Sequence, residues 1–97
     1  MEDLFDQADY LLFESRDFVA AQDIYKLILE LEPQNVDAIT SMAYCIKFAA
    51  ASTQDPLPDT LFNDLNKLYR QALAIEVNDI EANFNLGMLY LEFNKDM

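Results

Sequence analysis

The chain has 97 residues, of which 53% are hydrophobic, so it can bury the core of one small domain and is not expected to be globally disordered. Its 18 acidic residues outnumber its 6 basic residues and give a net charge of −12, which argues against binding nucleic acid or an anionic membrane surface. With three prolines and one glycine, the composition favours long helices joined by short turns.

The first half of the chain is predicted to contain three amphipathic helices. Apolar residues at spacings of three and four predict a first helix over about Glu2–Ser15 and a second over about Phe18–Leu31. Pro33 ends the second helix, because proline cannot continue a helix and disfavours helical geometry at the residue before it. The same spacing predicts a third helix over about Asn35–Ala50.

The second half contains a loop-like segment followed by two more helical patterns. The segment STQDPLPD has two prolines and is predicted to be a loop, and Asp59 or Thr60 is expected to cap the next helix. This fourth helix is predicted to end near Glu76, and a fifth covers about Ile80–Asn94. No stretch alternates with a period of two for long enough to indicate a sheet, so we expect an all-α protein.

Corresponding residues recur at regular intervals along the chain. Ile39 follows Phe5 by 34 residues, whereas Ala82 follows Ala38 by 44. An interval of about 34 residues is the period of repeats in which two antiparallel helices form one unit. The second interval is about ten residues longer, and the segment with the prolines lies inside it.

At these positions the chain resembles the tetratricopeptide repeat (TPR) family, and the resemblance covers essentially its whole length. Leu86, Gly87 and Tyr90 match the pattern of the first helix of a TPR unit. Val77 departs from the pattern, because a proline is usual there. The other matching positions are Phe5, Ala21, Tyr25 and Pro33 in the first unit and Tyr69 and Ala72 in the second.

The resemblance implies a single domain over residues 1–97, folded as a right-handed α-solenoid of five helices, or about two and a half TPR units. The units expected are residues 2–35, residues 36–79 with an insertion of about ten residues around 51–60, and a half repeat over 80–97. Stacked helix pairs of this kind build a superhelix with a concave side.

The resemblance also implies a binding groove, because the first helix of each TPR unit lines the concave side. One end of this groove would be acidic and the rest aromatic and aliphatic, which favours a partner peptide or helix with apolar anchors and basic residues. The alternative is that these side chains pack against one another, or against residues that are not in this sequence. The lining residues implied are Asp3, Asp6, Tyr10 and Phe13, then Asp37, Thr40, Tyr44 and Lys47, then Glu81, Phe84, Met88 and Leu91.

The loop-like segment is a second candidate site. Leu57 lies between its two prolines and could dock into a partner, since loops on rigid scaffolds often carry recognition. The alternative is a longer hairpin with an ordinary helix cap.

Residues that would indicate catalysis are missing. The chain has no histidine, which is the commonest general base, and Cys45 is expected to be a small buried apolar residue. No calcium-binding loop or glycine-rich phosphate loop is present. We therefore expect no enzymatic activity, no cofactor and no metal site. The lone cysteine also favours a cytoplasmic or other intracellular reducing compartment.

The last helical pattern is apolar over most of its surface. Three interpretations stay open: the chain is an excised piece of a longer repeat protein, a partner or second copy covers the helix, or the helix bends and buries itself. Its large apolar residues are Phe84, Leu86, Met88, Leu89, Tyr90, Leu91 and Phe93.

The sequence therefore favours a non-enzymatic protein–protein interaction module or adaptor. The first 38 residues hold ten acidic and two basic residues, which would steer a basic partner toward that half of the chain. The alternative is that these residues form a solvated acidic surface that maintains solubility. Self-association, or assembly into a larger complex through the final helix, is also expected, whereas nucleic acid and membrane insertion are not. The alternative function is a dedicated chaperone for a basic or hydrophobic client protein.

Overall fold

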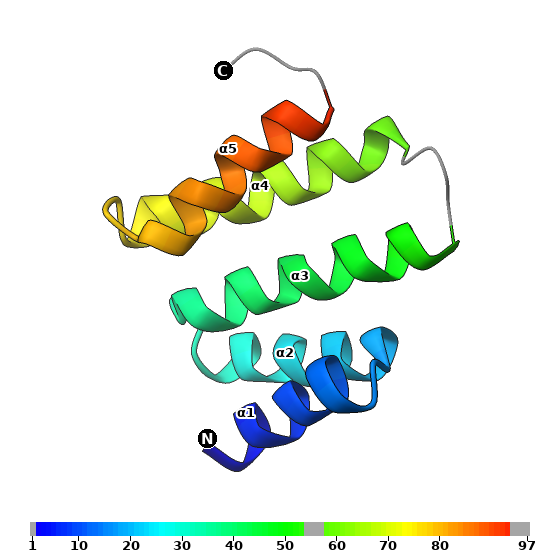
Figure 1. Ribbon diagram of the computed structural model, residues 1–97. Coiled ribbons are helices and arrows are strands. Elements are labelled where there is room, and N and C mark those ends of the chain that lie inside the picture. Colours follow the sequence, from blue (N-terminus) through cyan, green and yellow to red (C-terminus); the bar gives the residue numbers. More distant parts are fainter. Residues whose placement is uncertain (1, 54–57, 94–97) are drawn as a thin grey trace.

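The fold, seen in a computed structural model that describes residues 2–53 and 58–93, is all-helical (Figure 1). Over these residues it has five helices and no strand, as the spacing of apolar residues predicts. The elements are α1 (Glu2–Asp9) with the π-helix η1 (Tyr10–Glu14) that continues it, α2 (Phe18–Leu31), α3 (Val36–Thr53), α4 (Asp59–Ile75) and α5 (Ile80–Glu92).

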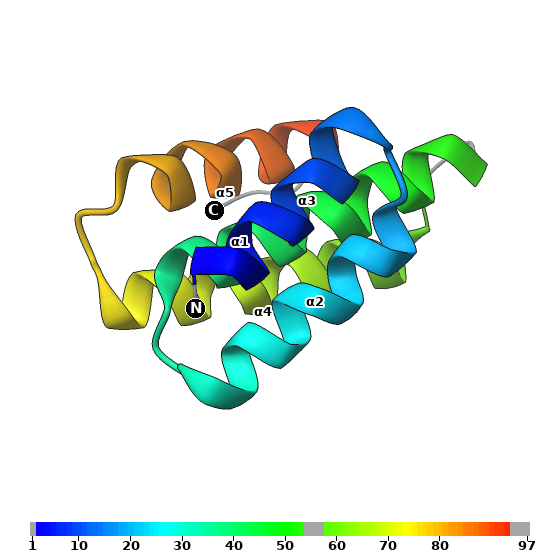
Figure 2. The same cartoon turned by 90° about the horizontal axis from the view of Figure 1, so that it is seen from below.

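Each helix packs mainly on its neighbours in the chain. Contacts join α1 to α2, α2 to α3, α3 to α4 and α4 to α5, and the chain direction reverses from each helix to the next (Figure 1). Viewed from below, α1 and α5 lie toward one side and α2 and α4 toward the other (Figure 2). The molecule measures 38 × 32 × 18 Å, and its smallest dimension is about two helices thick, because packed helix axes lie roughly 8–10 Å apart.

Three apolar clusters form the core, and α3 contributes to all of them. The first joins α1 and η1 to α2 and α3, the second joins α3 to α4 and α5, and the third joins the N-terminal end of α3 to α4 and α5. The central position of α3 explains why its apolar residues are not confined to one narrow stripe. The buried members are Ala8, Leu12, Ala21, Tyr25, Ile28, Ala38 and Cys45; Ala43, Leu61, Leu65, Tyr69, Leu86, Leu89 and Tyr90; and Val36, Ile39, Ala72 and Ala82.

The turns before α3 and α5 have the same geometry although they lie 44 residues apart. The Glu32 amide donates to the Ile28 carbonyl at 2.7 Å, and the Glu76 amide donates to the Ala72 carbonyl at 2.8 Å. The Asn35 and Asp79 side chains then cap the following helices by accepting from the amides of Ala38 and Ala82. Residues 44 apart therefore occupy equivalent positions in these two turns.

The first helix ends differently from the prediction, because its last turn is widened. The Ser15 amide donates to the Tyr10 carbonyl five residues back, at 3.0 Å, and this bond belongs to the π-helix η1. The Asp17 amide then donates to the Leu11 carbonyl at 2.8 Å. Arg16, which lies between Ser15 and Asp17, has a φ of 55°. A residue in this left-handed region closes the helix and turns the chain toward α2.

The segment around 51–60 corrects two predictions. Residues 51–53 are helical, since α3 continues to Thr53 rather than ending near Ala50. The expected cap of α4 is also wrong, because Pro58 occupies the capping position without a side-chain hydrogen bond. A backbone hydrogen bond forms at this end of the helix instead, because the Leu61 amide donates to the Pro58 carbonyl at 3.0 Å. Leu57 lies outside the described residues.

Candidate functional site

An acidic group forms where the N-terminal ends of α3 and α5 meet. Glu81 on α5 feels the negative charges of Asp79 and Asp37, the latter on the first turn of α3. Partial burial raises the pKa of the Glu81 carboxyl, and these two charges raise it further. The structure thus brings together two of the acidic residues implied for the groove, Asp37 and Glu81.

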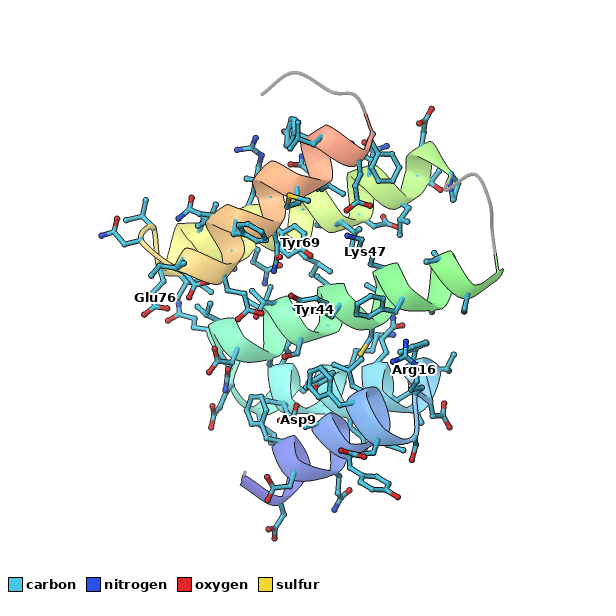
Figure 3. The ribbon with its side chains drawn as sticks, in the orientation of Figure 1. Asp9, Arg16, Tyr44, Lys47, Tyr69 and Glu76 are labelled. Carbon is cyan, nitrogen blue, oxygen red and sulfur yellow. The ribbon has the colours of Figure 1, made fainter. Side chains whose placement is uncertain are left out.

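The other ends of α3 and α5 are joined by an ion pair. Lys47 on α3 contacts Glu92 on α5, and both side chains are about one-third exposed. Figure 3 shows Lys47 in the region between α3 and the two C-terminal helices. The cation implied for the groove is therefore matched by a carboxylate that the sequence pattern did not indicate. The spacing from Lys47 to Glu92 gave no signal of this contact, because the two residues lie on different helices and 45 positions apart.

Two tyrosines, Tyr44 on α3 and Tyr69 on α4, are labelled in Figure 3. Tyr44 is partly buried and stacks on Phe48, with ring centroids 5.5 Å apart and planes 18° apart. Tyr69 on α4 is almost fully buried, and burial raises the pKa of its hydroxyl. The charges of Tyr44, Glu81 and Glu92 raise that pKa further.

The groove residues implied on α1 and η1 lie on the surface. Asp3 and Asp6 are exposed, and so are the rings of Tyr10 and Phe13. Asp6 and Tyr10 line a depression whose remaining walls are Gln7, Leu11 and Ile24. This depression is built by α1, η1 and α2. That it forms one continuous groove with the implied residues of α3 and α5 stays a prediction.

On α5 the apolar residues implied for the groove are exposed, whereas Thr40 on α3 is not. Phe84, Met88 and Leu91 all reach solvent. Thr40 was expected to line the groove, and this is wrong, because its side chain is buried. Its hydroxyl donates back to the carbonyls of Val36 and Asp37, both at 3.2 Å, so burial leaves no unpaired polar atom.

Cys45 belongs to the same core cluster as Tyr25, a buried tyrosine that is hydrogen-bonded to the partly buried carboxylate of Asp9. The Tyr25 hydroxyl donates to Oδ1 of Asp9 at 2.5 Å, and Asp9 is labelled in Figure 3. Burial raises the pKa of the Tyr25 hydroxyl, and Asp9 raises it further. Burial, with the charge of Asp9, also raises the pKa of the Cys45 thiol to about 11. The thiol therefore stays protonated at neutral pH and is a poor nucleophile.

Among the described residues no group of three or more His, Cys, Asp or Glu side chains is arranged to hold a metal ion. Nor does that part of the chain contain a helix with the length and apolar character needed to traverse a bilayer. A comparison with protein-family models, with curated proteins and with solved structures found no match to the chain. The function must therefore be inferred from the residues and their contacts.

Proposed function

We propose that the chain is a non-enzymatic protein–protein interaction module, folded as an α-solenoid of TPR-like helix pairs. Its binding groove would run along α1, α3 and α5 and accept a peptide or helix of a partner protein. The observation that carries the proposal is that Tyr44 on α3 and Glu81 on α5 both act on the hydroxyl of Tyr69 on α4, while Asp37 on α3 acts on Glu81.

The charge of this surface favours a basic partner. Like charges raise the pKa of Glu81, so a cation placed beside Glu81 and Asp37 would relieve their repulsion. The net charge of −12 adds a long-range attraction for a basic segment. By the same reasoning, an acidic peptide with a free C-terminal carboxylate would be repelled.

A donor without a protein partner lies near the same surface. Nδ2 of Asn85 is buried and makes no hydrogen bond within the described part of the chain. Asn85 follows Glu81 by one helical turn, so both lie on one face of α5. A buried donor without a partner is costly, so the Asn85 side chain would gain a hydrogen bond by turning outward to a bound peptide.

Fluorescence anisotropy tests the proposal with a labelled peptide of about fifteen residues in which lysines flank leucine and phenylalanine at helical spacing. We expect binding that weakens as salt is added, since the attraction is partly between exposed charges. A peptide with glutamates in place of the lysines should not bind. The informative variant is Asp37→Asn with Glu81→Gln, which should weaken binding roughly tenfold.

The matched control removes the same two charges elsewhere. Asp23→Asn with Glu30→Gln neutralises two exposed carboxylates on α2 and leaves the proposed groove intact. If both double variants weaken binding equally, the peptide is responding to net charge alone and the groove assignment is wrong. Circular dichroism on each variant confirms that the helices are retained.

A dedicated chaperone for a basic or hydrophobic client is the second candidate. The exposed rings of Tyr10 and Phe13 on η1 favour it, because adaptable apolar surface suits a client that is not yet folded. The two functions differ in stoichiometry. An adaptor remains in the final complex with its partner, whereas a chaperone suppresses aggregation of a client and is then released.

A further inference from the structure

The outward face of α5 is apolar and uncovered. Ile80 and Phe84 are 84% and 65% exposed, and Leu91 and Met88 on the same face also reach solvent. The opposite face of α5, with Ala82, Leu86 and Leu89, is buried against α3 and α4. The exposed apolar residues are therefore not needed to hold α5 in the fold.

The equivalent face of α3 is buried by packing against other helices, unlike the exposed face of α5. Residues 44 positions earlier, Val36 and Thr40, correspond to Ile80 and Phe84 but are only 9% and 2% exposed. Val36 packs with Ala72 of α4 and with Ala82 of α5. On α3 this face is thus an interface for an amphipathic helix, and α4 is the helix that follows and packs on it.

Gly87 marks the centre of the uncovered face. Its equivalent on α3 is Ala43, which is fully buried in a cluster with Leu61, Leu65 and Tyr69 of α4. A Cβ atom built on Gly87 would meet no heavy atom within 4 Å, so the space above the helix backbone is open. A helix docked here could place a large side chain over Gly87, as α4 places leucines near Ala43.

We infer that the face of α5 formed by Ile80, Phe84, Gly87 and Leu91 binds an amphipathic helix of a partner protein, seated as α4 is seated on α3. The partner helix carries apolar residues in the pattern of Leu61, Leu65, Leu68 and Ala72. It has a large side chain opposite Gly87 and a small one opposite Phe84, because phenylalanine is larger than the threonine that it replaces.

The negative charge beside this face of α5 favours a basic partner helix over a second copy of this chain. Asp79 and Glu81 flank the face, and each copy carries a net charge of −12. Two copies meeting face to face would bring these carboxylates together, which opposes association. A partner helix with lysine or arginine beside its apolar stripe would pair with them. The inference goes beyond the proposed groove and assigns Phe84 and Leu91 to this separate interface.

The test uses the full chain and a peptide derived from its own α4. The probe is a helix-stapled synthetic peptide with the sequence of Asp59–Ile75 in which both aspartates are replaced by lysine. We expect saturable one-to-one binding by isothermal titration calorimetry. A second peptide of identical composition, with the apolar residues spread around the helix, controls for net charge and should bind at least about tenfold more weakly.

One matched pair of variants locates the binding face. Gly87→Glu adds a better helix former in open space, so the fold is retained, but it puts a carboxylate in the apolar contact. Binding of the probe should weaken at least about tenfold. Val19→Glu adds the same charge to exposed α2 and should leave the affinity unchanged within about twofold.

Two results would overturn the inference. Equal binding of both peptides, or equal loss in both variants, would show that the probe follows charge and not this face. Concentration-dependent dimerisation in sedimentation experiments, abolished by Gly87→Glu, would show that a second copy covers the face. Loss of probe binding in Gly87→Glu alone, with the chain monomeric, supports a partner helix. The groove test uses different variants and a different peptide, so either proposal can fail without the other.

Discussion

The turn between α2 and α3 and the turn between α4 and α5 are built alike, yet the helices that follow them have different surroundings. Both turns use a glutamate amide bonded to the preceding helix and a side-chain cap three residues later, with matching backbone angles at Glu32 and Glu76. Beyond them, α3 is covered on two sides, whereas α5 leaves Ile80 and Phe84 exposed. Local sequence thus determines the turn, and the next packed helix determines burial.

The difference also appears inside the core, where equivalent positions hold residues of unequal size. Ala21 on α2 and Leu65 on α4 lie 44 residues apart, and both are buried. Tyr25 and Tyr69 are a second equivalent pair, and both have raised pKa values because they are buried. Substitutions at such pairs test whether the two halves are equivalent in energy as well as in geometry.

The largest effect is expected at the first pair. Leu65→Ala leaves a cavity among Ala43, Leu86 and Leu89 and should lower the free energy of unfolding by about 2–5 kcal/mol. Ala21→Leu places extra volume in a filled site and should cost about 1–3 kcal/mol. Urea denaturation followed by circular dichroism measures both. A neutral Ala21→Leu would mean that the packing around α2 is looser than the packing around α4.

The second effect separates the two tyrosines. Tyr25→Phe removes the donor to Asp9 and leaves a partly buried carboxylate without that bond, so unfolding should become easier by about 1–3 kcal/mol. Tyr69→Phe should cost less, because the side-chain hydrogen bonds between α4 and α5 are made by other residues. Arg70 donates to the Tyr90 hydroxyl at 2.8 Å, and that hydroxyl donates to Asn66 at 3.2 Å. The same denaturation experiment ranks the two variants. Equal losses would contradict a special role for Asp9.

Helix positions were largely predictable from the sequence because the apolar spacing and Pro33 act locally. The range of α2 agrees with the prediction, and that of α5 begins where expected. The π-helix at Tyr10–Glu14 could not be predicted, because it depends on how the last turn of the first helix meets α2. The extension of α3 to Thr53 was also missed, since nearby prolines suggested a loop.

The candidate site was predictable only in part. The resemblance implied Asp37 and Glu81 for one groove, and both follow equivalent turns at the starts of α3 and α5, where the charge of Asp37 raises the pKa of Glu81. The same reasoning failed for Thr40, whose burial depends on the helices packed around α3. Glu92 was missed for a related reason, since its contact with Lys47 spans 45 residues and follows from packing and not from local pattern.

A smaller effect concerns Gly87 and its equivalent, Ala43. Gly87→Ala should stabilise the chain by about 0.5–1 kcal/mol, because glycine is unfavourable within a helix and the added methyl group enters open space. Ala43→Gly should destabilise by at least as much, since it also removes a buried methyl group. Thermal denaturation of the two variants measures the difference. A destabilising Gly87→Ala would mean that the space above Gly87 is occupied in solution.

The smallest effect is electrostatic and depends on pH. The pKa of Glu81 is raised in the folded chain, so the contribution of this group to stability is fully present below its unfolded pKa and is lost as pH rises through the folded pKa. At pH 7 the charged carboxylate is therefore slightly unfavourable. Glu81→Gln should raise stability there by no more than about 0.5 kcal/mol, because an exposed carboxylate is well screened.

The gain from Glu81→Gln should disappear below the ordinary pKa of a glutamate, where Glu81 is protonated in both the folded and the unfolded chain. It should also shrink in high salt, because added ions screen the repulsion from Asp79 and Asp37. Glu30→Gln on α2 is the control, since it removes a similar exposed carboxylate from outside the acidic group. A pH-independent gain would instead point to a change in helix propensity. An equal gain in Glu30→Gln would show that net charge alone, and not the meeting of α3 and α5, sets the effect.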